Sequence, residues 1–178
     1  MKKVYIYIAS VFVAFSSCKE NKKTEPAAND GIVVTNEAPM SAESKAEAEM
    51  EKTDSAIKAY VAANKLDTNM TNTGLVYKIL KTNPKGKAIH FTDKVKVKYK
   101  GTLLDGTPFD QGEFEFEVGA HAVIPGWDEG IELMKEGEKM LLIVPFWQGY
   151  GENGSGPIPP YGTMVFEMEA LQVTPSQK

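Results

Sequence analysis

The chain has 178 residues, of which 42% are hydrophobic and 25% are charged. This composition supplies enough apolar material for one compact domain with appendages, and too little for a second domain. The net charge of −4 argues against a nucleic-acid binder, because such proteins need a basic surface. Two histidines and one cysteine cannot supply a His/Cys zinc site or a disulfide framework, so we expect no metal and no cofactor.

The N-terminus has the pattern of an export leader. Lys2 and Lys3 precede the apolar run 4–15, and two serines then lead to Cys18. As a helix, this run of about 12 residues would rise about 18 Å, well short of a hydrocarbon core of roughly 30 Å. We therefore expect residues 1–17 to be a cleaved signal peptide rather than a membrane span.

The segment Phe15–Cys18 stands where the leader would be cleaved. It resembles a bacterial lipobox, whose cysteine receives lipid and becomes the mature N-terminus. The resemblance implies an exported lipoprotein, anchored to a membrane through Cys18 on the periplasmic side or in the cell envelope. The alternative is a secreted protein with an unpaired thiol, which is disfavoured because an odd cysteine in an oxidising compartment is otherwise hard to explain.

Two segments of different character follow the leader. Residues 18–43 are rich in Lys, Glu, Asn, Pro, Ala and Thr, and this composition predicts a flexible tether. Residues 44–72 predict a spacer helix, over about 44–66, and a linker. The side chains that support the helix are Ser44 and Glu47, which match a capping box, and Ile57, Tyr60 and Val61 at helical spacing. The apolar stripe is narrow, so a solvated spacer and a docking or dimerisation face are both open.

From residue 73 onward, short strand patterns alternate with turn residues. Residues 73–91 predict a leading strand and a turn, and residues 92–175 predict the main domain. In one strand of that domain apolar residues alternate with lysines, as expected of a half-buried antiparallel strand whose lysines face water. These lysines are Lys94, Lys96, Lys98 and Lys100. About five strands are expected, near residues 75–80, 95–99, 114–116, 140–144 and 165–171.

One helix is predicted among these strands. It covers about residues 126–134, with Trp127 and Ile131 on one face and Asp128 in its first turn, and Gly137 is placed to end it. A sheet of short strands with one packed helix is an α+β domain. We therefore expect an antiparallel sheet of about five strands wrapped on one short helix, after the tether and the possible spacer helix.

Five strings of residues carry the most specific information in the chain. They are Val97–Leu103, Asp105–Asp110, Val123–Gly130, Pro145–Gly151 and Ile158–Phe166. Their order and spacing resemble the FKBP-type peptidyl-prolyl cis-trans isomerase family over roughly residues 92–175. The resemblance implies an FKBP-like fold and an enzyme that rotates X-Pro bonds without a cofactor. Its partners would be proline-containing exported polypeptides, whose folding it assists.

The same resemblance implies a role for each residue of a central pocket. The floor and the aromatic walls would be Trp127, Tyr99, Phe109 and Phe166. The Ile124 backbone N–H and the Tyr150 hydroxyl would donate to substrate carbonyls, and Asp110 would order the edge of the site through hydrogen bonds. The rim and the flanking substrate-binding positions would be Val123, Phe114 and Ile158.

The expected reaction explains the need for these residue types. Rotation about an X-Pro bond faces a barrier of about 18–20 kcal/mol because amide resonance is lost, and it requires no proton transfer and no nucleophile. A dry aromatic pocket would favour the twisted amide, which is less polar than the planar form. The alternative function is a non-catalytic chaperone or assembly module that holds proline-containing segments in the same cleft.

Overall fold

The computed structural model describes residues 42–176. The expected signal peptide, the expected lipid-bearing Cys18 and the tether up to residue 41 lie outside these residues, whereas the last two residues of the predicted tether, Ala42 and Glu43, belong to a helix. The described elements, in chain order, are α1 (Ala42–Ala63), β1 (Asn69–Met70), β2 (Val76–Lys81), β3 (Lys94–Leu103), β4 (Pro108–Glu117), α2 (Pro125–Ile131), β5 (Lys139–Val144), the 3₁₀ helix η1 (Phe146–Gln148) and β6 (Met164–Thr174).

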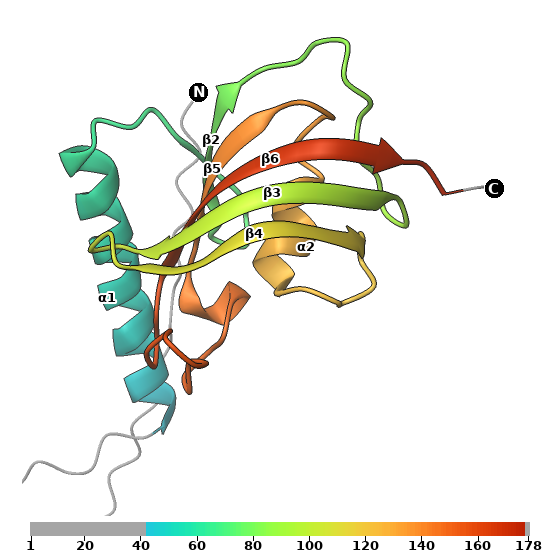
Figure 1. Cartoon of the computed structure of the whole chain (residues 1–178). Coiled ribbons are helices and arrows are strands. Elements are labelled where there is room, and N and C mark those ends of the chain that lie inside the picture. The colour runs from blue at the N-terminus through green and yellow to red at the C-terminus, as the bar shows by residue number, and fades with distance from the viewer. Residues whose placement is uncertain (1–41, 177–178) are drawn as a thin grey trace, which may run out of the picture. The chain divides into compact units, whose positions relative to one another are not determined.

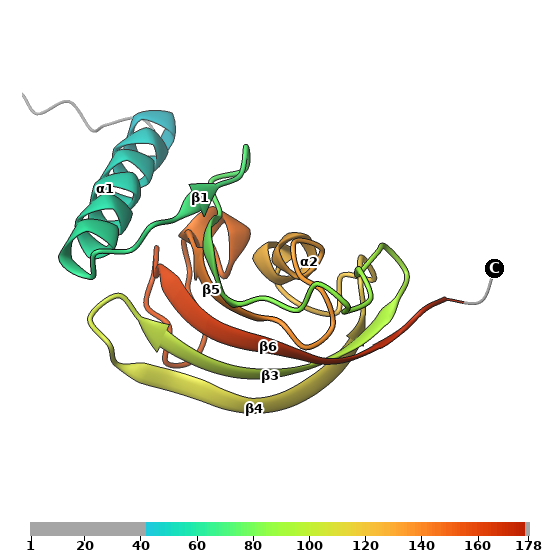
Figure 2. The same ribbon diagram turned by 90° about the horizontal axis from the view of Figure 1, so that it is seen from above.

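The six strands form one antiparallel sheet in the order β1-β2-β5-β6-β3-β4. The sheet curves around α2, which lies on its inner face, whereas α1 lies outside the curve (Figures 1 and 2). The predicted sheet wrapped on one short helix is confirmed. The sixth strand, β1, has two residues that pair with β2, and a strand this short leaves no period-2 pattern to detect.

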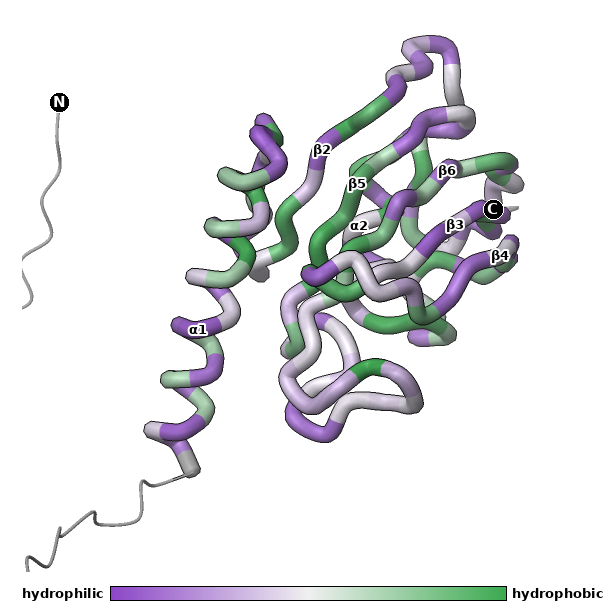
Figure 3. The backbone as a smooth tube through the Cα atoms, turned by 60° about the vertical axis from the view of Figure 1, so that its left-hand side comes forward, coloured by the Kyte–Doolittle hydropathy of each residue, from purple (hydrophilic) through white to green (hydrophobic). Residues whose placement is uncertain are grey.

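The core lies between the inner face of the sheet and α2. In β3 burial alternates along the strand, since Val95 and Val97 are fully buried in this core while Lys94 and Lys98 are exposed and Lys96 is half-buried. Strand β5 differs because Met140–Val144 is buried on both faces, and its tube in Figure 3 is hydrophobic along most of its length. A strand covered on both sides reads as a continuous apolar run rather than an alternating one.

Helix α1 provides the second cover of β5. Ile57 is 4% exposed and packs in a second cluster with Leu141 and Ile143 of β5 and Val165 of β6. In the structure the apolar stripe of α1 thus packs on the chain's own sheet. Among residues 42–176, no helix is both long enough and apolar enough to cross a bilayer.

The predicted end of α2 is wrong. The helix stops at Ile131, and the next residues turn through bonds of the 3₁₀ type, in which Met134 N–H donates to the Ile131 carbonyl at 3.1 Å. This tighter turn brings Met134 into the core, where it is 1% exposed. Gly137 instead serves the turn into β5, where its φ is +81° and its N–H donates to the Ala170 carbonyl at 2.7 Å.

Candidate functional site

A cleft of about 210 Å³ opens on the inner face of the sheet beside the start of α2. Its walls come from β3, β4 and β6, from α2 with the loop before it, and from the loop after η1. The lining residues are Tyr99, Phe109, Asp110, Phe114, Ala122, Val123, Ile124, Trp127, Tyr150 and Phe166. The structure thus brings together nine of the ten predicted side chains and adds Ala122, whose small side chain gave no signal in the sequence.

Trp127 lies at the centre of an edge-to-face aromatic cluster. Its ring centroid is 4.9 Å from that of Tyr99 and 5.2 Å from that of Phe166, with interplanar angles of 76° and 81°. Phe109 continues the cluster at 5.5 Å and 90° from Phe166. Aromatic pairs prefer this edge-to-face geometry. The rings form an aromatic slot within the cleft.

Gly101 explains how these walls meet. A Cβ atom there would lie 2.5 Å from Phe109 Cζ and 3.0 Å from Phe166 Cε1, so any side chain would displace a ring. The residue sits on β3 opposite Phe166 in the strand register. A glycine is needed at this position because the Phe109 ring occupies the space where a side chain would stand.

Tyr99 and Asp110 form the polar edge of the cleft. The Tyr99 hydroxyl donates to Asp110 Oδ2 at 2.7 Å, and the Gln111 N–H donates to Asp110 Oδ1 at 2.8 Å. Burial and the hydrogen bond to the Asp110 carboxylate raise the pKa of Tyr99 to about 12. Tyr99 therefore stays protonated at physiological pH, and each Asp110 carboxylate oxygen accepts one of these hydrogen bonds.

Three donors lie around the aromatic slot. Ile124 has extended backbone angles just before α2, and no hydrogen bond from its N–H is found within residues 42–176. Tyr150 is 43% exposed at the mouth of the cleft. The Trp127 indole N–H is buried without a partner among the described residues, and sequence reasoning gave no warning of it.

Ile158 is the predicted site residue that does not line the cleft. It is 6% exposed and belongs to the main core cluster. Its backbone exchanges two hydrogen bonds with Ser155, at 2.9 and 3.0 Å, so the loop closes tightly on itself. Ile158 is thus a core residue in this structure, and its predicted role in substrate binding stays a prediction.

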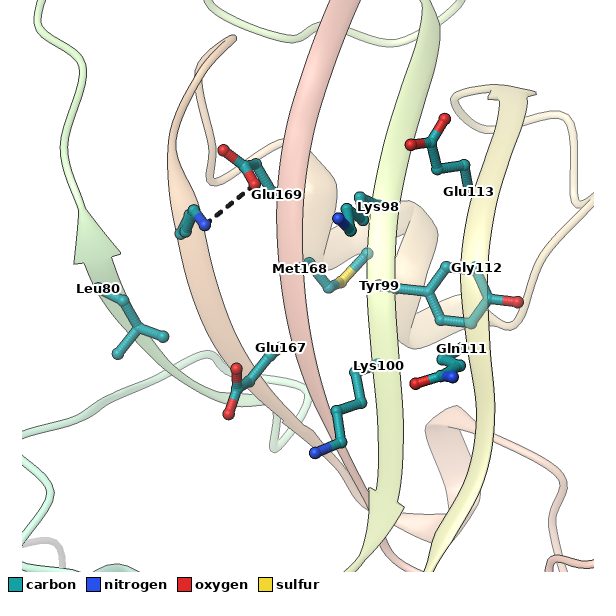
Figure 4. A pocket seen from close by; sticks show the side chains of 11 residues that line it. Leu80, Lys98, Tyr99, Lys100, Gln111, Gly112, Glu113, Glu167, Met168 and Glu169 are labelled. Atoms are coloured by element: carbon teal, nitrogen blue, oxygen red, sulfur yellow. Dashed lines mark ion pairs between the residues drawn. The ribbon is translucent and has the colours of Figure 1, made fainter.

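A second groove, of about 540 Å³, lies on the outer face of the sheet (Figure 4). Charged side chains from neighbouring strands dominate its walls, including Lys98, Lys100 and Glu167, and Lys139 pairs with Glu169 at 3.1 Å. The β3 lysines do face water, as predicted. Tyr99 is the one aromatic residue among the described residues that line this groove, so the groove lacks the aromatic walls of the cleft. Across residues 42–176, no group of three or more His, Cys, Asp or Glu side chains could hold a metal ion.

The comparisons with known proteins agree on one family. The family model for FKBP-type peptidyl-prolyl cis-trans isomerase matches residues 85–171. Over 111 residues the chain is 42% identical to the FKBP-type peptidyl-prolyl cis-trans isomerase FkpA of Escherichia coli K12, covering 61% of this chain and 41% of FkpA. It is 43% identical over 117 residues to the FKBP-type 22 kDa peptidyl-prolyl cis-trans isomerase of the same strain, covering 62% of this chain and 55% of the relative. The chain thus spans about half the length of these curated relatives.

Solved structures share the fold. The crystal structure of FkpA from Escherichia coli matches with a TM-score of 0.61 and 36% identity, over 76% of this chain and 67% of FkpA. A peptidyl-prolyl cis-trans isomerase from Pseudomonas syringae pv. tomato matches with a TM-score of 0.60 and 30% identity, over 71% of this chain and 96% of that structure. The chain belongs to the FKBP-type peptidyl-prolyl cis-trans isomerase family.

Proposed function

We propose that this chain is a peptidyl-prolyl cis-trans isomerase that rotates X-Pro bonds in exported polypeptides and so assists their folding. The observation that carries the proposal is the aromatic slot over Trp127, with Tyr99 and Phe166 held edge-on around it. Family membership supports the reaction type. The cleft, of about 210 Å³, is large enough to receive a proline ring.

Each group of the cleft has a task in this reaction. The proline ring lies on Trp127, whose surroundings exclude water and so favour the less polar, twisted amide over the planar one. The Ile124 N–H and the Tyr150 hydroxyl hold substrate carbonyls on either side of the rotating bond. Asp110 fixes the Tyr99 ring through its hydroxyl. No step transfers a proton, which is consistent with the high pKa of Tyr99, about 12.

The proposal is tested by the exchange rate of a short peptide with one X-Pro bond, measured by NMR with residues 19–178 at micromolar concentration. Uncatalysed exchange takes tens to hundreds of seconds, so catalysis is readily seen. Rates equal to buffer alone, from a folded sample, would contradict the isomerase. In that case retained peptide binding would identify a chaperone or assembly module that uses the same cleft.

Tyr150→Phe tests the hydroxyl at the mouth of the cleft. If this group donates to substrate, kcat/KM should fall about tenfold, the effect of one lost hydrogen bond. The melting temperature should stay within a few degrees, because Tyr150 is 43% exposed. Tyr161→Phe, which removes a hydroxyl outside the cleft lining, is the matched control and should leave turnover unchanged. Equal activity in both variants would remove Tyr150 from the site.

We also propose that the mature protein is held at a membrane by lipid on Cys18. The support is the sequence alone, a short apolar run followed by the one cysteine of the chain. Each buried CH₂ contributes about 0.8 kcal/mol of membrane affinity, so two or more acyl chains anchor a protein stably whereas one does not.

Fractionation of cells that express wild type and Cys18→Ser tests the anchor. Wild type should sediment with membranes and carry acyl mass on Cys18, because the lipid is attached before the leader is cleaved. Cys18→Ser should keep its leader, since lipoprotein processing requires the modified cysteine. Mature, soluble wild type with an unmodified thiol would show a secreted isomerase instead.

A further inference from the structure

A hydrogen-bonded turn at residues 71–75 joins the segment before β2 to α2. Thr73 Oγ1 lies 2.8 and 2.7 Å from the two carboxylate oxygens of Glu129, and 2.7 Å from Thr71 Oγ1. Thr71 Oγ1 in turn accepts the Leu75 N–H at 3.2 Å. This turn lies before residue 85, where the match to the family model begins.

The direction of these bonds follows from the donors available. A carboxylate only accepts, so Thr73 must donate its single proton to Glu129. The Thr71 hydroxyl then donates to Thr73 Oγ1, and the chain runs from Leu75 N–H through Thr71 and Thr73 to Glu129. Hydrogen bonds aligned in this way and ending on a charge polarise and strengthen one another. The turn is therefore fixed to α2 two residues beyond Trp127.

The same turn is fixed to η1. The Trp147 indole N–H donates to the Thr73 carbonyl at 2.9 Å. Gly74 has φ +94°, and a Cβ there would lie 3.0 Å from Trp147 Cζ2, so the backbone passes directly against the indole ring. Trp147 belongs to η1, which leads through Gly149 to Tyr150 at the mouth of the cleft.

A third contact is made through the core. Leu75 is fully buried, and its Cδ2 atom would lie 3.1 Å from a Cβ on Gly126. Gly126 is the second residue of α2 and precedes Trp127. The turn thus meets α2 at two places, through Leu75 at Gly126 and through Thr73 at Glu129.

We propose that Thr73 is a positioning residue that sets α2 and η1, and with them the cleft floor at Trp127 and its mouth at Tyr150, relative to each other. Neither Thr73 nor its partners Glu129 and Trp147 line the cleft, so Thr73 acts on the cleft through the elements that carry these partners. One side chain and its own carbonyl hold both elements at once. For catalysis this inference rests on the isomerase function proposed above.

The contacts of Thr73 with Glu129 of α2 and Trp147 of η1 are called the clamp below. Thr73→Val tests the clamp, because valine keeps the shape of threonine and removes the donor to Glu129. We expect kcat/KM to fall about fivefold, the effect of about one hydrogen bond. In the NMR spectrum the Trp127 indole N–H signal should move, although Trp127 does not contact Thr73. Thr73→Ser restores the hydroxyl and should return both quantities to wild-type values. The matched control is Thr82→Val at an exposed position after β2, which should change neither.

The indole signal separates this inference from the isomerase proposal, since it needs no turnover. If wild type proves inactive, a moved Trp127 signal in Thr73→Val that serine restores still supports the clamp. A Trp127 signal that stays at its wild-type position in Thr73→Val overturns the clamp, whatever happens to the melting temperature.

Discussion

Replacing Phe166 with alanine should lower the free energy of unfolding by about 3–5 kcal/mol and remove most isomerase activity. Phe166 is 3% exposed, and its ring packs edge-to-face on both Trp127 and Phe109. Alanine would leave a cavity beneath the slot and free the two neighbouring rings to turn. Urea unfolding measures the first effect, and peptide exchange at a temperature where the variant is folded measures the second.

Phe114→Ala is the matched control for this experiment. The same atoms are removed from the same cleft, but Phe114 is 45% exposed and stacks only on Phe116. Its loss should cost less than about 1.5 kcal/mol and lower activity modestly, because little buried area is lost. Equal losses of stability in the two variants would show that Phe166 does not anchor the cleft wall.

The strands could be predicted from the sequence wherever one face of the sheet is exposed to water. In β3 lysine and valine alternate, because successive side chains point to opposite faces, and Val95 and Val97 were placed in the core correctly. The continuous run of β5 predicted a strand but not its second cover. That cover is α1, whose Ile57 packs with residues of β5 that lie more than 80 positions further along the chain.

The candidate site was predictable through the resemblance rather than through spacing. Side chains from residue 99 to residue 166 meet in one cleft because β3 pairs with β4 on one side and β6 on the other. No local sequence pattern predicts this pairing of the strands. The same limit explains Ile158, whose sequence neighbours favoured the site but whose loop closes through Ser155 and turns the side chain into the core.

Local sequence patterns also failed to predict two backbone turns, the one that ends α2 and the one at residues 71–75. Gly137 has the features of a helix terminator, yet α2 ends six residues earlier because the burial of Met134 requires a tighter turn. The turn at Thr71–Leu75 gave no signal beyond Thr73-Gly74. Its partners, Glu129 and Trp147, are more than 50 residues away.

Ile57→Asp should detach α1 from the sheet. Ile57 is 4% exposed and packs in one cluster with Leu141, Ile143 and Val165. Burying an unpaired carboxylate there would cost too much free energy. The helix would leave the surface instead, so the loss is limited to the docking free energy, about 2–4 kcal/mol by comparison with large-to-small core substitutions. The melting temperature should fall by roughly 10 °C, and a dye that binds exposed apolar surface should respond to the uncovered β5.

Ala59→Asp separates docking from helix formation. It places the same charge on α1 two residues away, at an exposed position. Because aspartate has a lower helix propensity than alanine, Ala59→Asp should lower the free energy of unfolding by less than about 0.7 kcal/mol. A small effect here beside a large one at Ile57 assigns the loss to the contact between α1 and the sheet. Equal, small effects at both positions would mean that α1 is a solvated spacer and that β5 keeps its stability without a second cover.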